Sequence, residues 1–195
     1  MASVKDKKIL VNDIFERIHK FRKNWEIEKS EKLWKRLASP NRFDSDEVIF
    51  IKRILQRELP KEVRETVTQE LFDKYVTTDE AEFAKKLYLS LEEIKEMSDE
   101  GMYFSSHSYS HEWLGYLEPE NLDEEMKKSW KFCKKINPDR QQIMCYPYGN
   151  YNTDVIEKIL EYNFKAGLTT DVGDAILDNE NAFNLRRYDT NDFPQ

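Results

Sequence analysis

The segment GMYFSSHSYSH, residues 101–111, lies between two different sequence patterns and holds two of the three histidines of the chain. Before it, apolar residues recur at helical spacing, and after it short apolar runs alternate with amphipathic segments. Met102 to Ser106 reads as a short strand that leads directly into His107. Strands that alternate with helices are typically parallel, and functional side chains gather where such strands end. The segment therefore predicts an α/β fold with His107 at its functional edge.

Three more strands are expected after this segment, at residues 142–146, 164–170 and 183–187. Helices are expected between them, one from Asn121 to near Asn137 and one that begins at Thr153. The pattern predicts about four mostly parallel strands with helices packed outside. The residues that follow these strand ends are candidates for a site: His107, Pro147-Tyr148-Gly149, Thr169-Thr170 and Arg187.

The part of the chain before Gly101 is expected to be almost wholly helical, from residue 9 to residue 100. One apolar stripe at helical spacing runs from Ile9 to Phe21, and a second runs from Val48 to Leu55. Ser90 with Glu93 forms a capping-box pattern, which predicts the start of a further helix that Gly101 can close. We therefore expect the chain to divide near residue 101.

The composition is that of a polar globular protein. The 195 residues suit one domain, and the formal net charge of −7 argues against nonspecific binding to nucleic acid or to anionic membranes. No run of about 20 apolar residues is present, so no membrane span is expected. Lys5, Lys7 and Lys8 precede only a short apolar run, which is no signal peptide. Two cysteines, Cys133 and Cys145, read as free thiols, so a cytoplasmic location is expected.

His107 and His111 are spaced so that a helical turn or a tight loop can bring both imidazoles to one cation. Neutral imidazole suits zinc, and the surrounding serine hydroxyls could orient the rings. A catalytic zinc site normally has three protein ligands, so this pair is one short. The alternative is a polar loop with two surface histidines.

Two further segments carry candidate chemistry. Tyr146-Pro147-Tyr148-Gly149 can expose a backbone N–H and an aromatic face, which suit an oxyanion and a sugar ring, although an ordinary turn has the same pattern. Arg187 and Asp189 could orient a carboxylate or a substrate hydroxyl, and the alternative is a surface ion pair.

Together these segments resemble the polysaccharide deacetylases of the NodB-homology group, also called carbohydrate esterase family 4. The run from His107 to His111 resembles that family's His-Ser/Thr-x-x-His metal motif, and Tyr146–Gly149 resembles the Pro-Tyr-Gly part of its third motif. Gly167–Thr170 and Arg187–Asn191 look like later segments of the branch found in surface-polysaccharide gene clusters. The likeness covers about residues 86–194.

The resemblance implies a partial (β/α) barrel of the deacetylase type with a mainly helical N-terminal insertion. Residues 1–100 would be the insertion and residues 101–195 the C-terminal part of the barrel, within one structural domain. It also implies metal-dependent hydrolysis of the N-acetyl group of an acetamido sugar in surface-glycan biosynthesis. His107 and His111 would hold a divalent metal, usually zinc, that activates a water and polarises the acetamide carbonyl. The backbone N–H of Tyr148 would face the oxyanion, and Pro147, Tyr148, Arg187 and Asp189 would bind substrate.

The sequence also departs from that family. No Asp-Asp pair occurs, no histidine follows His111, and Cys145 stands where the family's third motif begins with arginine. The base and the acid are therefore not found, and zinc is expected to be held weakly. We expect the C-terminal part of a deacetylase that self-associates or needs a second chain to complete the barrel. The alternatives are a catalytically inactive carbohydrate-binding or assembly module and a truncated gene product.

Overall fold

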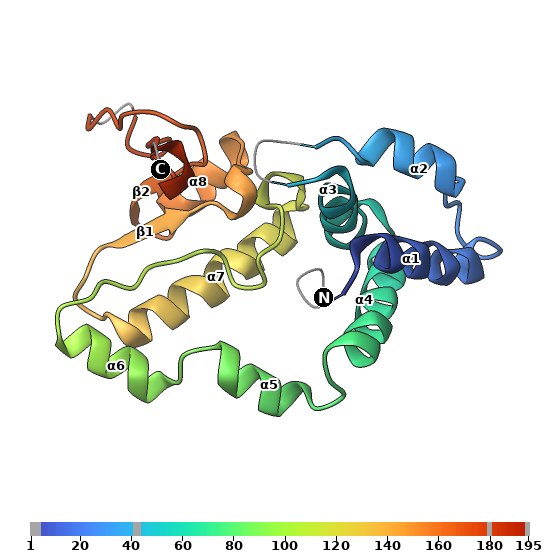
Figure 1. Cartoon of the computed structure of the whole chain (residues 1–195). Helices are drawn as coiled ribbons and strands as arrows, with labels where there is room; N and C mark the ends of the chain where they lie inside the picture. Colours follow the sequence, from blue (N-terminus) through green and yellow to red (C-terminus); the bar gives the residue numbers. More distant parts are fainter. Residues whose placement is uncertain (1–4, 41–43, 179–180, 194–195) are drawn as a thin grey trace. The chain divides into compact units, whose positions relative to one another are not determined.

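The structure is a computed structural model that describes residues 5–40, 44–178 and 181–193. The chain forms two compact units, Met1–Tyr88 and Leu89–Gln195. Each unit has its own hydrophobic core. Figure 1 labels the helices and strands of both units. Whether residues 1–100 are an insertion into a larger barrel stays a prediction.

The first unit is built from helices, as the apolar stripes predict. They are α1 (Lys7–Phe21), α2 (Ser30–Leu37), α3 (Asp46–Arg53), α4 (Lys61–Tyr75) and α5 (Glu80–Leu87), with a π-helical segment, η1, at Ile54–Glu58. Helix α1 packs against α3 and α4, and α2 packs against α3. Of the predicted stripes, Ile14, Ile18 and Ile54 are fully buried, whereas Ile9 is exposed. Leu10, Phe50, Val67 and Leu71 are also fully buried in this core.

A charged cluster lies at the edge of this core. The buried carboxylate of Asp13 on α1 accepts a hydrogen bond from Lys74 Nζ at 2.7 Å, and Arg17 Nη1 lies 3.5 Å away. The Tyr75 hydroxyl donates to the same oxygen. Although burial opposes ionisation, these partners hold the pKa of Asp13 below its usual value. The cluster therefore joins α1 to the end of α4 and leaves the buried charge paired.

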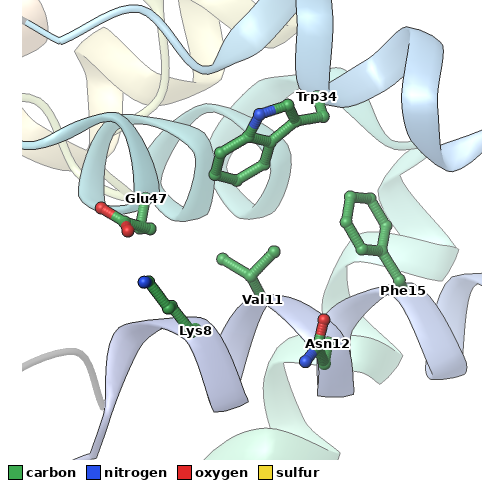
Figure 2. A pocket seen from close by; sticks show the side chains of 6 residues that line it. All are labelled: Lys8, Val11, Asn12, Phe15, Trp34 and Glu47. Carbon is green, nitrogen blue, oxygen red and sulfur yellow. The ribbon is translucent and has the colours of Figure 1, made fainter.

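A hollow of about 370 Å³ opens in the first unit between α1, α2 and α3 (Figure 2). Val11, Phe15 and Trp34 give it an apolar wall, while its polar lining consists of Lys8, Asn12 and Glu47. An aromatic wall beside polar groups is an arrangement that can hold a small amphipathic ligand.

The second unit mixes helices with a small parallel sheet. Its elements are α6 (Leu91–Asp99), α7 (Pro119–Ile136), β1 (Gln142–Cys145), α8 (Thr153–Glu161) and β2 (Phe164–Leu168), with 3-10 turns η2 (Leu114–Tyr116), η3 (Pro147–Gly149) and η4 (Thr190–Asp192). The capping box of Ser90 with Glu93 opens α6, and Gly101 follows its end with φ +93°, both as predicted. Helix α7 packs on α8, and Met126, Met144, Tyr146 and Ile159 lie fully buried nearby.

The prediction of four strands is wrong at two places. Strands β1 and β2 pair in parallel, but residues 102–106 and 183–187 contribute only the parallel bridges Ser106–Met144 and Leu168–Leu185. The Ser105 hydroxyl accepts from Ile143 N at 2.7 Å, so a side chain takes a bond that a strand would form through its backbone. Asn184 N bonds back to Asn181 O in a turn, which limits the other pairing. The four segments are nevertheless joined by parallel pairings. The predicted partial barrel is not confirmed.

Within the described residues, no helix combines the length and the apolar character needed to cross a membrane. Both cysteines are free thiols: Cys133 is buried, and Cys145 is half-buried at the end of β1.

Candidate functional site

The loop from Ser108 to His111 is held by side chains rather than by a backbone ladder. The Ser108 amide donates to Ser106 Oγ at 3.2 Å, and the His111 amide donates to Ser108 Oγ at 3.0 Å. Tyr109 N and Ser110 N both donate to Glu125 Oε2, at 3.1 and 2.9 Å. Ser108 and His111 adopt positive φ values, 63° and 60°, which L-residues rarely adopt. This tight turn brings His111 back toward His107.

The structure brings the two predicted metal ligands together. His107 Nε2 and His111 Nε2 lie 3.0 Å apart, and both residues are partly exposed to solvent. Two nitrogens bound tetrahedrally to one zinc would lie about 3.3 Å apart, so these two are within reach of a single ion. His107 Nδ1 lies 2.6 Å from the carbonyl oxygen of Cys145. Because a carbonyl only accepts, Nδ1 carries the proton and neutral His107 turns its Nε2 lone pair toward His111.

The electrostatics of the two imidazoles differ. Hydrogen bonding of the His107 ring to Cys145, first to its side chain and also to its backbone carbonyl, raises the pKa of His107 despite partial burial. Burial and the neighbouring His107 charge lower the pKa of His111. His107 is therefore the first of the two to take up a proton as the pH falls.

Tyr148 contacts His111 from the other side. Its hydroxyl lies 3.2 Å from His111 Nδ1, and the two rings meet edge to face at a centroid distance of 4.8 Å. The Trp113 ring stacks on Tyr148 at 4.4 Å with 11° between the planes. If Tyr148 accepts from Nδ1–H, the Nε2 lone pair of His111 faces that of His107. Two facing lone pairs need a cation between them, whereas the other tautomer of His111 makes an N–H···N hydrogen bond to His107.

The turn that carries Tyr148 depends on its neighbours. Tyr148 and Gly149 both have positive φ values, 58° and 64°, and a Cβ on Gly149 would lie 2.1 Å from Thr170 Oγ1. The turn therefore packs closely on the end of β2. Pro147 is buried beneath it.

The predicted substrate residues of the last segment lie in two different settings. Arg187 Nε donates to Thr169 O at 2.8 Å, and the guanidinium charge helps to lower the pKa of Cys145, after the larger contribution of the His107 hydrogen bond. Arg187 is thus placed near His107 and Cys145. Asp189 instead caps η4, where its Oδ1 accepts from Asn191 N at 2.9 Å and from Asn191 Nδ2 at 2.6 Å. The roles of both residues in substrate binding stay predictions.

Among the described residues, the histidine pair has no third metal-binding partner. In the part of the chain that the structure describes, no group of three or more His, Cys, Asp or Glu side chains is arranged to hold a metal ion. His107 and His111 fit two ligand positions of a divalent ion, because both are imidazoles. His107 is also oriented by a contact at Nδ1, as metal-binding histidines usually are. A hollow of about 280 Å³, lined by serines 105, 106, 108 and 129 together with Phe132 and Cys133, opens beside His107.

Two residues of this site were not found by sequence reasoning. Glu125 holds the loop from α7, and Trp113 covers Tyr148. Glu125 lies 14 residues after His111 among several acidic residues of an amphipathic helix, so no spacing signal marks it. Trp113 could have been noticed as a large aromatic residue two positions after His111.

Comparison with known proteins gives a family match, a curated relative and two solved structures. The family model described as polysaccharide deacetylase matches residues 66–167, slightly more than half of the chain. The protein YxkH of Bacillus subtilis strain 168, assigned by name to the polysaccharide deacetylases, is 31% identical over 93 residues, which cover 48% of this chain and 33% of YxkH. This chain thus spans about one third of that relative's length.

Among solved structures, the Streptococcus pyogenes deacetylase PplD in complex with acetate matches with a TM-score of 0.50 and 21% identity, over 91% of this chain and 79% of that chain. A polysaccharide deacetylase from Bacillus cereus matches with a TM-score of 0.45 and 28% identity, over 51% of this chain and 31% of that chain. The PplD match indicates a deacetylase-like fold.

Proposed function

The chain belongs to the polysaccharide deacetylase family, and from that premise we propose that it carries the histidine half of a metal-dependent N-deacetylase site. The observation that carries the proposal is the 3.0 Å approach of His107 Nε2 and His111 Nε2, with His107 anchored through Nδ1. The substrate class is an acetamido sugar within a surface glycan.

Each residue has a distinct role in this proposal. His107 and His111 would hold a divalent ion, zinc by ligand type, which when bound supplies Lewis-acid polarisation of the acetamide carbonyl. The backbone N–H of Tyr148 donates to the developing oxyanion. Pro147 and the aromatic faces of Tyr148 and Trp113 border the sugar, and Arg187 and Asp189 bind its polar groups.

The reaction adds a water oxygen to the acetyl carbon and breaks the C–N bond, which yields acetate and a free amine on the sugar. Its base must take a proton from water and its acid must protonate the amine. The sequence holds no Asp-Asp pair and no histidine after His111. We therefore propose that the third ligand and the base come from outside these 195 residues, and that zinc is held weakly without them.

An NMR titration of the full chain tests this function. The probe is a tri-N-acetylated glucosamine trisaccharide, with and without zinc, and the control is the same trisaccharide without acetyl groups. We expect the acetylated sugar to shift the amide signals of Tyr148, Gly149 and Arg187 when zinc is present. The sugar without acetyl groups should not shift them. Equal shifts with both sugars, or none, would contradict the proposal.

An amine-release assay on the same sugar tests the missing base. The chain alone is expected to release no amine above the buffer rate. Turnover that disappears in the His107→Ala variant would show that a carboxylate of this chain acts as the base.

A second function, saccharide binding without catalysis, is favoured by the hollow lined by Phe15 and Trp34 in the first unit (Figure 2). Aromatic faces stack on sugar rings, and Asn12 and Glu47 can hydrogen-bond to hydroxyls. In the same titration this function predicts zinc-independent shifts around Val11 to Phe15. The Asn12→Ala variant should weaken those shifts, and their absence from the wild-type chain would exclude this function.

A further inference from the structure

We propose that Glu125 is a positioning residue for the metal site, because it fixes the loop that turns His111 toward His107. The inference rests on the proposed function and adds a residue to it. Glu125 lies on α7, well separated in sequence from the loop, and its carboxylate binds two consecutive loop amides, Tyr109 N at 3.1 Å and Ser110 N at 2.9 Å. The Ser110 hydroxyl donates to the other carboxylate oxygen.

These bonds matter because of what else holds the loop. All four amides of residues 108–111 donate to side-chain oxygens. The Ser108 and His111 amides donate to serines of the same segment, Ser106 and Ser108. The two amides between them donate to Glu125, which lies on a different element. A charged acceptor of several N–H and O–H groups binds more strongly than a neutral one. The carboxylate therefore ties the Tyr109 and Ser110 amides of the loop to α7.

Two more contacts come from the same face of α7. Lys128 Nζ lies 5.2 Å from the centroid of the Tyr109 ring, and Ser129 Oγ hydrogen-bonds Ser106 Oγ. Residues three and four positions apart lie on one side of a helix, so Glu125, Lys128 and Ser129 meet the loop together.

The loop needs such a tie because its conformation is strained. Ser108 at φ 63° and His111 at φ 60° are both in the left-handed region, which an L-residue occupies only when its surroundings hold it there. Without Glu125 the loop is expected to relax, and the two Nε2 atoms then no longer converge. Glu125 is not a ligand, because its oxygens are engaged by the loop and no metal-binding group of three forms among the described residues.

The test compares two glutamates of α7. Glu125→Ala removes the tie, whereas Glu120→Ala removes the same charge from an exposed residue in the first turn of the helix. Zinc affinity, measured by calorimetry on the full chain, is expected to fall about 10–100-fold in Glu125→Ala, as for other residues that orient metal ligands. Glu120→Ala is expected to match the wild type. Glu125→Gln keeps one acceptor oxygen and should lie between the two.

A second readout separates this proposal from the proposed function. Solvent exchange of the Tyr109 and Ser110 amides, followed by NMR without metal, should accelerate at least tenfold in Glu125→Ala and remain unchanged in Glu120→Ala. Ser110→Ala, which leaves α7 intact, should loosen the loop less. A wild-type chain that binds no zinc would overturn the proposed function, while the amide exchange still tests the tie. Equal exchange in the two alanine variants would overturn the role of Glu125.

Discussion

At the scale of single residues, His107 and His111 and the loop between them are held by contacts from three other segments of the chain. The four-residue spacing and the family-like motif predict that His107 and His111 converge, and their Nε2 atoms lie 3.0 Å apart. The carbonyl of Cys145, the hydroxyl of Tyr148 and the carboxylate of Glu125 reach the loop and the histidines from distant sequence positions. Such contacts depend on tertiary packing, so no local pattern could predict them.

The Tyr148 hydroxyl is expected to contribute to metal binding. Tyr148→Phe removes its contact with His111 Nδ1 and keeps the ring that stacks on Trp113. Zinc affinity should fall about tenfold, because a partner on the second nitrogen orients a metal-binding histidine. Calorimetry checks this, with Tyr116→Phe as the control from the same aromatic group. A Tyr148→Phe affinity equal to that of the control would mean that the hydroxyl does not orient His111.

At the scale of elements, apolar periodicity predicts most helices and the two paired strands. The helix from Ser30 to Leu37 was not singled out, and the segments at 102–106 and 183–187 are not strands. Their apolar pattern is suitable, but the Ser105 side chain and the turn at Asn184 take backbone partners that a strand would need. An apolar sequence pattern does not show which side chain or backbone group will pair with a given backbone N–H or C=O.

The contact of α1 with α4 is expected to depend on pH through Asp13. Its pKa is lowered in the fold, so its contribution is fully present above the unfolded value of about 3.9 and is lost as the pH falls through the folded value. Asp13→Asn should therefore lower the free energy of unfolding by about 1–3 kcal/mol at pH 7 and by much less at pH 2. Urea unfolding at both pH values measures this, with exposed Asp73→Asn as the control. An equal loss at both pH values would show that charge pairing is not the cause.

At the scale of the whole molecule, the chain is expected to associate. The segment at residues 102–106 pairs with β1 at a single bridge, and Met102, Tyr103 and Phe132 nearby are 53%, 44% and 45% exposed. Open sheet edges and exposed apolar side chains favour pairing with another chain. Light scattering at about 100 μM should detect a species larger than one chain. A single monomeric species would contradict this expectation and the need for a completing partner.

The most direct measurement is the zinc stoichiometry of the full chain by calorimetry, compared among the three histidine variants. We expect the wild type to bind about one zinc per chain, weakly, and His19→Ala, which alters a histidine of the first unit, to bind the same amount. His107→Ala and His111→Ala should each lose measurable binding, because one imidazole cannot hold the ion alone. Full zinc stoichiometry in His107→Ala, or equal losses in all three variants, would contradict a metal site at the histidine pair.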